Sequence, residues 1–72
     1  MAEIQLLCTV ALLEDVPGKG LVRGQVGTVV EVLAPGVFEV EFSGDTGQTY
    51  ASAAVIADQL MRLHHEPNHQ MA

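Results

Sequence analysis

Apolar and polar residues alternate most regularly in the stretch "VFEVEFS", residues 37–43. Phe38, Val40 and Phe42 fall on one side of an extended chain, and the glutamates between them fall on the other. Alternation with a period of two is typical of a strand that has one face in a core and one face in water. We therefore expect a half-buried strand here.

Three further apolar stretches are separated by clusters of turn-forming residues, "EDVPGKG", "APG" and "SGDTG". Short strands bounded by Gly, Pro, Asp and Ser are typical of small antiparallel barrels. The "APG" linker is short enough for a tight hairpin between two neighbouring strands. The additional strands are expected at Leu6–Leu13, which is apolar on both faces, at Val26–Leu33, and through "QTYAS" at residues 48–52.

The following stretch, "AAVIADQLMRL", allows two interpretations. Its Ala, Leu, Met and Gln residues favour a helix, but the segment is short. We expect a helical turn near Ala57–Gln59 that leads into a closing strand from Leu60 to about Leu63. A helix from Ala53 to Leu63 is the alternative.

These elements predict a mainly β fold, a small antiparallel barrel of about five strands with a helical turn before the last one. The barrel is expected over residues 1–65, with residues 66–72 as a flexible tail. The core is expected to join one face of each strand. Its predicted members are Phe38, Val40, Phe42, Val26 or Thr28, Val30, Val32, Val10, Leu12 and Leu60.

The chain of 72 residues carries nine carboxylates against Lys19, Arg23 and Arg62, a net charge of −6. Such acidity repels phosphate backbones and argues against a nucleic-acid partner. The single cysteine, Cys8, fits a reducing compartment. With no membrane-spanning stretch and no leader-like segment, we expect a cytoplasmic protein.

Two short motifs suggest hydrolytic enzymes. His65-Glu66-Pro67-Asn68-His69 spells H-E-x-x-H, but Pro67 disfavours the helix that would bring both histidines to one zinc ion. Asp45-Thr46-Gly47 spells the aspartic-protease tripeptide, but it lies between strands as a turn. We therefore expect no catalytic residue, cofactor or structural metal, although His64, His65 and His69 could bind metal adventitiously.

The stretch "ALLEDVPGKGLVRGQVGTVVEVLAPGVFEVEFSGDTGQTYA", followed by "ADQL", resembles a family of short bacterial proteins catalogued as domain of unknown function 4926. The resemblance rests on "LLED", "GQVGTVVEV", "FEVEF" and "ADQL". It implies an SH3-like barrel and no established activity. More distantly, "GQVGTVVEV" resembles KOW elements and the barrel of nitrile hydratase β subunits. In this motif Gly24 can adopt positive φ, and Gly27 lets a neighbouring backbone approach.

We expect a non-catalytic protein-interaction module that acts through a barrel face or a sheet edge. The partner is unidentified and could be a second copy or a protein encoded nearby; no membrane is involved. The alternatives are a weak KOW-like nucleic-acid-binding barrel and an accessory barrel of an enzyme complex. The candidate interaction residues are Lys19, Arg23, Gln25, Glu39 and Glu41.

Overall fold

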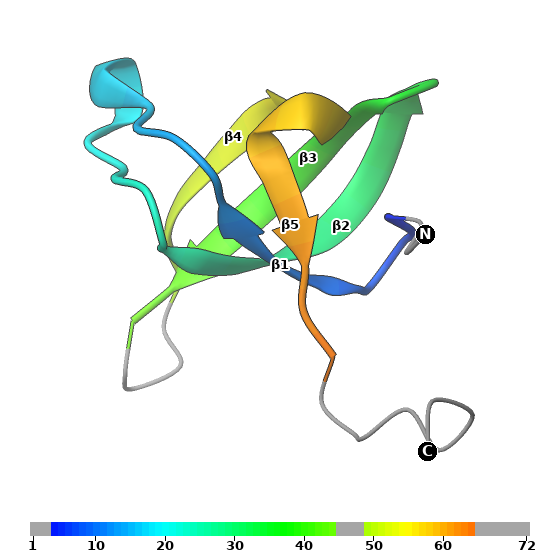
Figure 1. Cartoon of the computed structure of the whole chain (residues 1–72), viewed down its shortest axis with the longest axis horizontal. Coiled ribbons are helices and arrows are strands. Elements are labelled where there is room, and N and C mark those ends of the chain that lie inside the picture. Colours follow the sequence, from blue (N-terminus) through cyan, green and yellow to red (C-terminus); the bar gives the residue numbers. More distant parts are fainter. Residues whose placement is uncertain (1–3, 45–48, 65–72) are drawn as a thin grey trace.

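The structure is a computed structural model, and it describes residues 4–44 and 49–64. It consists of strands and two short helical turns (Figure 1). In chain order these are β1 (Thr9–Leu12), η1 (Pro17–Lys19), β2 (Val26–Ala34), β3 (Val37–Ser43), β4 (Thr49–Ile56), η2 (Ala57–Gln59) and β5 (Leu60–Arg62).

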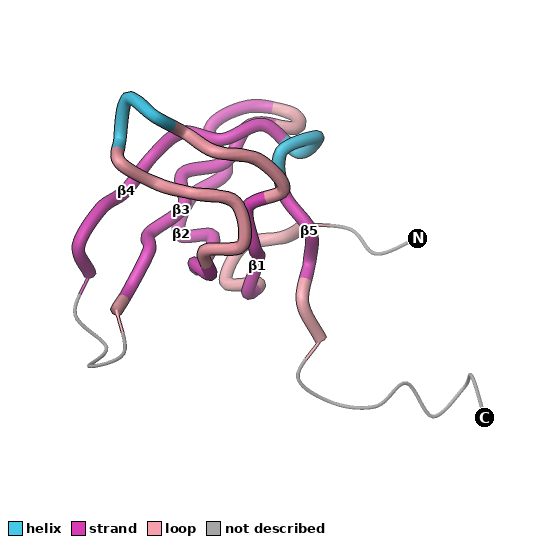
Figure 2. Tube along the Cα trace, turned by 60° about the vertical axis from the view of Figure 1, so that its left-hand side comes forward, coloured by secondary structure: helices cyan, strands magenta, loops and turns pink. Residues whose placement is uncertain are grey.

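The five strands form one antiparallel sheet in the order β4-β3-β2-β1-β5. The sheet curls around its buried face. As a result its two end strands, β4 and β5, both approach the core (Figures 1 and 2). The mainly β fold class, with a helical turn before the last strand, is therefore confirmed.

The hairpin between β2 and β3 forms where "APG" predicts it. Ala34 pairs with Val37, and Pro35 and Gly36 make the connection. Gly36 adopts a φ of 74°, a conformation that glycine takes without the steric cost of a Cβ atom. The strand predicted at residues 37–43 has the bounds of β3.

The segment after the expected fourth strand is extended, not helical. β4 continues to Ile56, η2 begins at Ala57, and β5 follows directly at Leu60. Gln59 fixes this corner: its side-chain oxygen accepts a hydrogen bond from the N–H of Ile56 at 3.3 Å, and its side-chain amide donates to Glu14 at 2.9 Å. The alternative of a helix from Ala53 to Leu63 is wrong, whereas the turn followed by a strand is confirmed.

The first strand is shorter than expected and begins at Thr9. Leu7, which precedes it, adopts a φ of 70°. The N–H of Leu7 donates to the carbonyl of Val29, and the N–H of Val29 donates to the carbonyl of Cys8. Two residues therefore face one across the ladder, which is a β-bulge with its first residue in the left-handed region. The bulge ends the regular pairing before Leu6.

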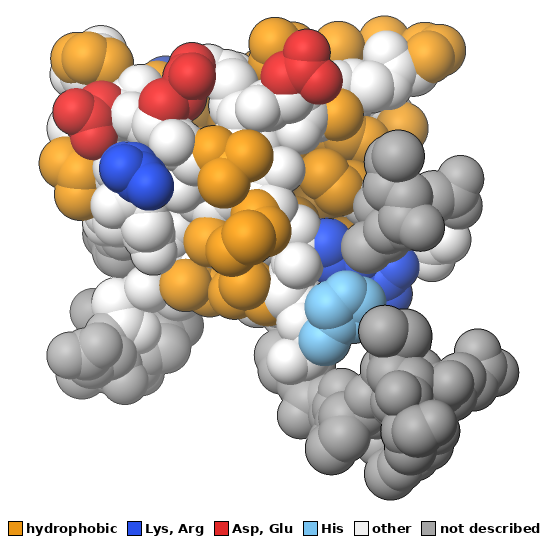
Figure 3. All heavy atoms as spheres, in the orientation of Figure 1, with side chains coloured by type: hydrophobic (Ala, Val, Ile, Leu, Met, Phe, Trp, Pro, Cys, Tyr) orange, Lys and Arg blue, Asp and Glu red, His pale blue; other side chains and the backbone are white. Residues whose placement is uncertain are grey.

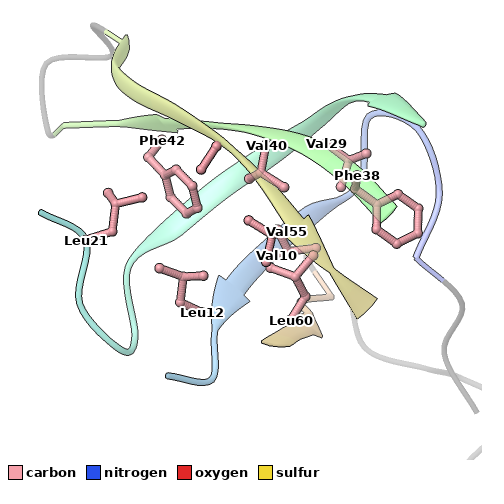
Figure 4. Close-up of a cluster of buried hydrophobic side chains, with 10 residues drawn as sticks. Val10, Leu12, Leu21, Val29, Phe38, Val40, Phe42, Val55 and Leu60 are labelled. Carbon is pink, nitrogen blue, oxygen red and sulfur yellow. The ribbon is translucent and has the colours of Figure 1, made fainter. Parts of the chain in front are cut away.

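The core is entirely apolar in the described part of the chain (Figure 4). Phe38, Val40 and Phe42 lie on the buried face of β3 as predicted. The core also contains four residues that the prediction left out, and one of them comes from the loop after β1. The full cluster is Val10, Leu12, Leu21, Val29, Phe38, Val40, Phe42, Ala53, Val55 and Leu60.

The predicted phase of β2 was wrong. Val26 and Val32 are 46% and 51% exposed, and Thr28 and Val30 are half-buried, whereas Val29 is fully buried. Gly27 pairs with Phe42 and Val29 pairs with Val40, so this strand presents its odd-numbered residues to the core at this end. Register shifts after Val29 and Val32 then change the alternation along the rest of the strand.

Candidate interaction surfaces

The outer face of β2, β3 and β4 carries two rows of cross-strand neighbours. One row runs from Glu31 through Glu39 to Ala54. The other runs from Thr28 through Glu41 to Ser52. Residues that face each other across antiparallel strands place their side chains on the same side of the sheet. We call these six residues the acidic face.

Within the acidic face, Glu31 lies directly opposite Glu39. Like charges in this relation destabilise a sheet by about 0.2–1 kcal/mol. Glu39 and Glu41 are half-buried, not fully exposed as predicted, because neighbouring strands flank them on both sides. Glu31 is exposed, and so are Ser52 and Ala54. The face therefore combines negative charge with short neutral side chains.

The loop between β1 and β2 is held by its own hydrogen bonds. Val16 and Leu21 form an isolated bridge, and Leu21 is only 1% exposed in the core. The Asp15 carboxylate accepts a hydrogen bond from the backbone N–H of Arg23 at 2.8 Å. These contacts give the loop a defined shape around η1.

Of the loop residues predicted to bind a partner, Lys19 and Arg23 are exposed and Gln25 is half-buried. The side-chain oxygen of Gln25 accepts a hydrogen bond from the N–H of Val22 at 2.6 Å. This hydrogen bond closes the turn by which the loop returns to β2. Lys19 and Arg23 thus belong to the loop and not to the cross-strand rows that contain Glu39 and Glu41.

A second surface is apolar. Ala11 pairs with Val26 on one side and with Met61 on the other. Val26 and Met61 are 46% and 49% exposed, and Ala11 between them is 7% exposed. Figure 3 shows hydrophobic side chains gathered in the middle of this face, over β1 and β5. We call Val26, Ala11 and Met61 the apolar strip.

The structure does not describe the residues of either enzyme-like motif. Asp45-Thr46-Gly47 and all of His65-Glu66-Pro67-Asn68-His69 lie outside the described residues. His64 is described and exposed. Over residues 4–44 and 49–64, no three residues among His, Cys, Asp and Glu come close enough to hold a metal ion.

The described residues include no helix that is long and apolar enough to cross a bilayer. In a comparison with known families, residues 6–62 match the family described as Domain of unknown function (DUF4926). The chain belongs to this family. Within the matched residues, "GQVGTVVEV" covers the two residues before β2 and most of that strand, "FEVEF" lies in β3, and "ADQL" covers η2 and the first residue of β5. No curated protein and no solved structure gives a match.

Sequence reasoning found Glu39 and Glu41 but missed Glu31. The hairpin at "APG" contained the required signal, since a two-residue connection sets which residues of the two strands face each other. The register shifts within β2 concealed it. The apolar strip was also signalled, because Leu6–Leu13 is apolar on both faces. The structure agrees with that pattern, since Val10, Ala11 and Leu12, which alternate between the two faces of β1, are all buried.

Proposed function

We propose that this chain is a non-catalytic protein-interaction module whose acidic face binds a basic protein. The observation that supports the proposal is the direct pairing of Glu31 with Glu39. This arrangement costs folding free energy, and a cationic partner would convert the cost into attraction. The other neighbours in the two rows, Thr28, Ser52 and Ala54, contribute no positive charge.

The charge of the whole chain supports the same partner chemistry. A net charge of −6 attracts a basic protein and speeds its association, most strongly at low ionic strength. Only three basic residues are present, so few phosphates could be neutralised in a nucleic-acid complex. A basic protein therefore fits the chain better than a nucleic acid does.

The test is affinity capture from the native host with variants that change the same amount of charge. Glu31→Gln combined with Glu39→Gln removes two charges from the acidic face. Glu14→Gln combined with Asp58→Asn removes two charges elsewhere, since these two exposed residues lie outside the rows. We expect the wild type and the control to capture the same basic protein, and the face variant to lose it.

Equal capture by the face variant and the control would contradict the proposal. Captured material that is sensitive to nuclease, and that depends on Lys19 and Arg23, would instead favour the nucleic-acid alternative. Loss of capture with both double variants would point to charge in general and not to the acidic face.

A further inference from the structure

β4 is an edge strand with an open side. In the described part of the chain its only strand neighbour is β3, and Figure 2 shows it lying outside β3. The strand runs from Thr49 to Ile56 and contains no charged residue and no proline. Natural edge strands are commonly protected by lysine, proline or a strong twist, because an unprotected edge pairs with other strands. This edge lacks the first two of those protections.

The hydrogen-bonding groups on the open side can be assigned from two bonds at the end of β4. The N–H of Ala57 donates to the carbonyl of Gly36, at the β3 side, at 2.9 Å. The N–H of Ile56 points the other way and donates to Gln59. Successive residues of a strand direct their backbone groups to opposite sides. It follows that the N–H and C=O groups of Ser52 and Ala54 face away from β3.

We infer that the open side of β4 pairs with β4 of a second copy of this chain, as two antiparallel strands related by a two-fold axis. Centring the axis on Ala53 places Ser52 opposite Ala54 of the second copy, and Ala54 opposite Ser52. Each of these two pairs can exchange two backbone hydrogen bonds. The surface is therefore complementary to itself, as a two-fold interface requires.

The side chains of β4 permit this approach. Ser52 and Ala54 are exposed on the outer face, and both are short. Ala53 would face its own copy at a closely spaced, non-hydrogen-bonded position, where a small side chain fits. The Ile56 N–H is already bonded to Gln59, which limits the new ladder to the Ser52–Ala54 segment. We therefore expect a weak dimer that dissociates on dilution.

The absence of charge on β4 allows a second copy to approach at this edge. Two molecules of net charge −6 repel each other, but β4 carries no charge, and the carboxylates paired with Ala54 and Ser52, those of Glu39 and Glu41, lie on β3. In the paired register, Glu39 of one copy and Glu41 of the other are separated by three strand spacings, or roughly 14 Å. Repulsion over that distance is largely screened at physiological ionic strength, where the Debye length is about 8 Å.

This inference adds a second copy to the proposed interaction role, but it uses the edge of β4 and not the acidic face. It is tested without any basic partner, so either proposal can fail alone. Sedimentation velocity from micromolar to millimolar concentration should show the molar mass rising from 7.7 kDa towards twice that value. A mass that stays at 7.7 kDa across this range overturns the inference.

Amide hydrogen exchange identifies the edge in the wild-type protein. We expect the amides of Ser52 and Ala54 to exchange rapidly in dilute solution and to become protected as the protein is concentrated. The amides of Ala53 and Val55 point towards β3 and should be protected at both concentrations. A dimer in which Ser52 and Ala54 still exchange rapidly would place the interface elsewhere and overturn the inference.

Two substitutions at one position give an independent check. Ala54→Pro removes an N–H group from the open edge, and Ala54→Val keeps it. We expect the proline variant to remain a monomer at concentrations where the wild type and the valine variant are dimers, with circular dichroism showing that each is folded. Dimerisation of a folded Ala54→Pro variant to the wild-type extent would also overturn the inference, and the exchange measurement decides the case if that variant does not fold.

Discussion

Gly27 lies directly opposite Phe42 in the β2–β3 ladder. A Cβ atom on Gly27 would come within 2.9 Å of Cδ1 of Phe42 and within 2.7 Å of the carbonyl oxygen of Glu41. The carbonyl belongs to the backbone of a paired strand and cannot rotate away. Glycine is required at this position because of the close approach of β3, as "GQVG" predicts.

Gly27→Ala should therefore lower the free energy of unfolding by about 1–3 kcal/mol, the usual cost of overpacking. Gly18→Ala is the matched control, since a Cβ atom there would have no neighbour within 4 Å. We expect the control to stay within about 0.5 kcal/mol of the wild type. Urea denaturation followed by circular dichroism measures both, and identical midpoints would contradict the packing argument.

Phe42 is fully buried in the core. Phe42→Ala should cost about 3–5 kcal/mol, from lost burial and from the cavity left behind. A domain of this size often has little more stability than that. We expect the variant to be largely unfolded at room temperature by circular dichroism. Val32→Ala, at a position that is 51% exposed, should remain folded, and an unfolded Val32 variant would show that the phase of β2 described here is wrong.

The pattern of the sequence was sufficient for β3, for the hairpin at "APG" and for the turn at Ala57–Gln59. In these segments the alternation and the turn residues agree with each other. In β2 the run "VGTVVEVL" has apolar residues at both parities, so the alternation alone does not select a face. Pairing with β3 and the bulges select it, and these are tertiary features. Leu21 was missed for a similar reason: a single apolar residue in a loop has no period.

The repulsion between Glu31 and Glu39 can be measured as a coupling free energy in a double-mutant cycle. Glu31→Gln and Glu39→Gln should each raise the free energy of unfolding by about 0.2–1 kcal/mol, because either change removes the repulsion. The double variant should gain little beyond one single variant, since the repulsion can be removed only once. Thermal or urea denaturation of the four proteins at low salt completes the cycle. Fully additive gains would mean that the two carboxylates do not interact.

Substitutions of Leu7 measure how much the bulge before β1 lowers the free energy of unfolding. It has a φ of 70° and is 72% exposed, so its side chain contributes little packing. Leu7→Gly should be more stable than Leu7→Ala by about 1 kcal/mol, because alanine keeps the steric cost of a left-handed conformation and glycine does not. Both variants lose the same exposed side chain beyond Cβ. Denaturation midpoints compare them, and an alanine variant as stable as the glycine variant would show that the bulge is not strained.

The candidate surfaces were less predictable than the fold. Glu39 and Glu41 could be assigned to one side of a strand from alternation alone, but the position of Glu31 depends on the register of the hairpin. The open side of β4 depends on the strand order, which places that strand at the end of the sheet. Composition can identify an uncharged strand, but only the topology shows that the strand has no neighbour on one side in the described structure.

The position of β1 between β2 and β5 has a consequence for biosynthesis. Of the five described strands, β1 emerges from the ribosome first, and β5, which pairs with its second edge, emerges last. Until Leu60 has been made, Leu12 lacks its partner in the ladder and one edge of β1 stays open. Contacts between such distant segments slow folding. A chain that is cut before β5 should therefore be less stable than the intact chain, and we expect it to be a substrate for chaperones and proteases.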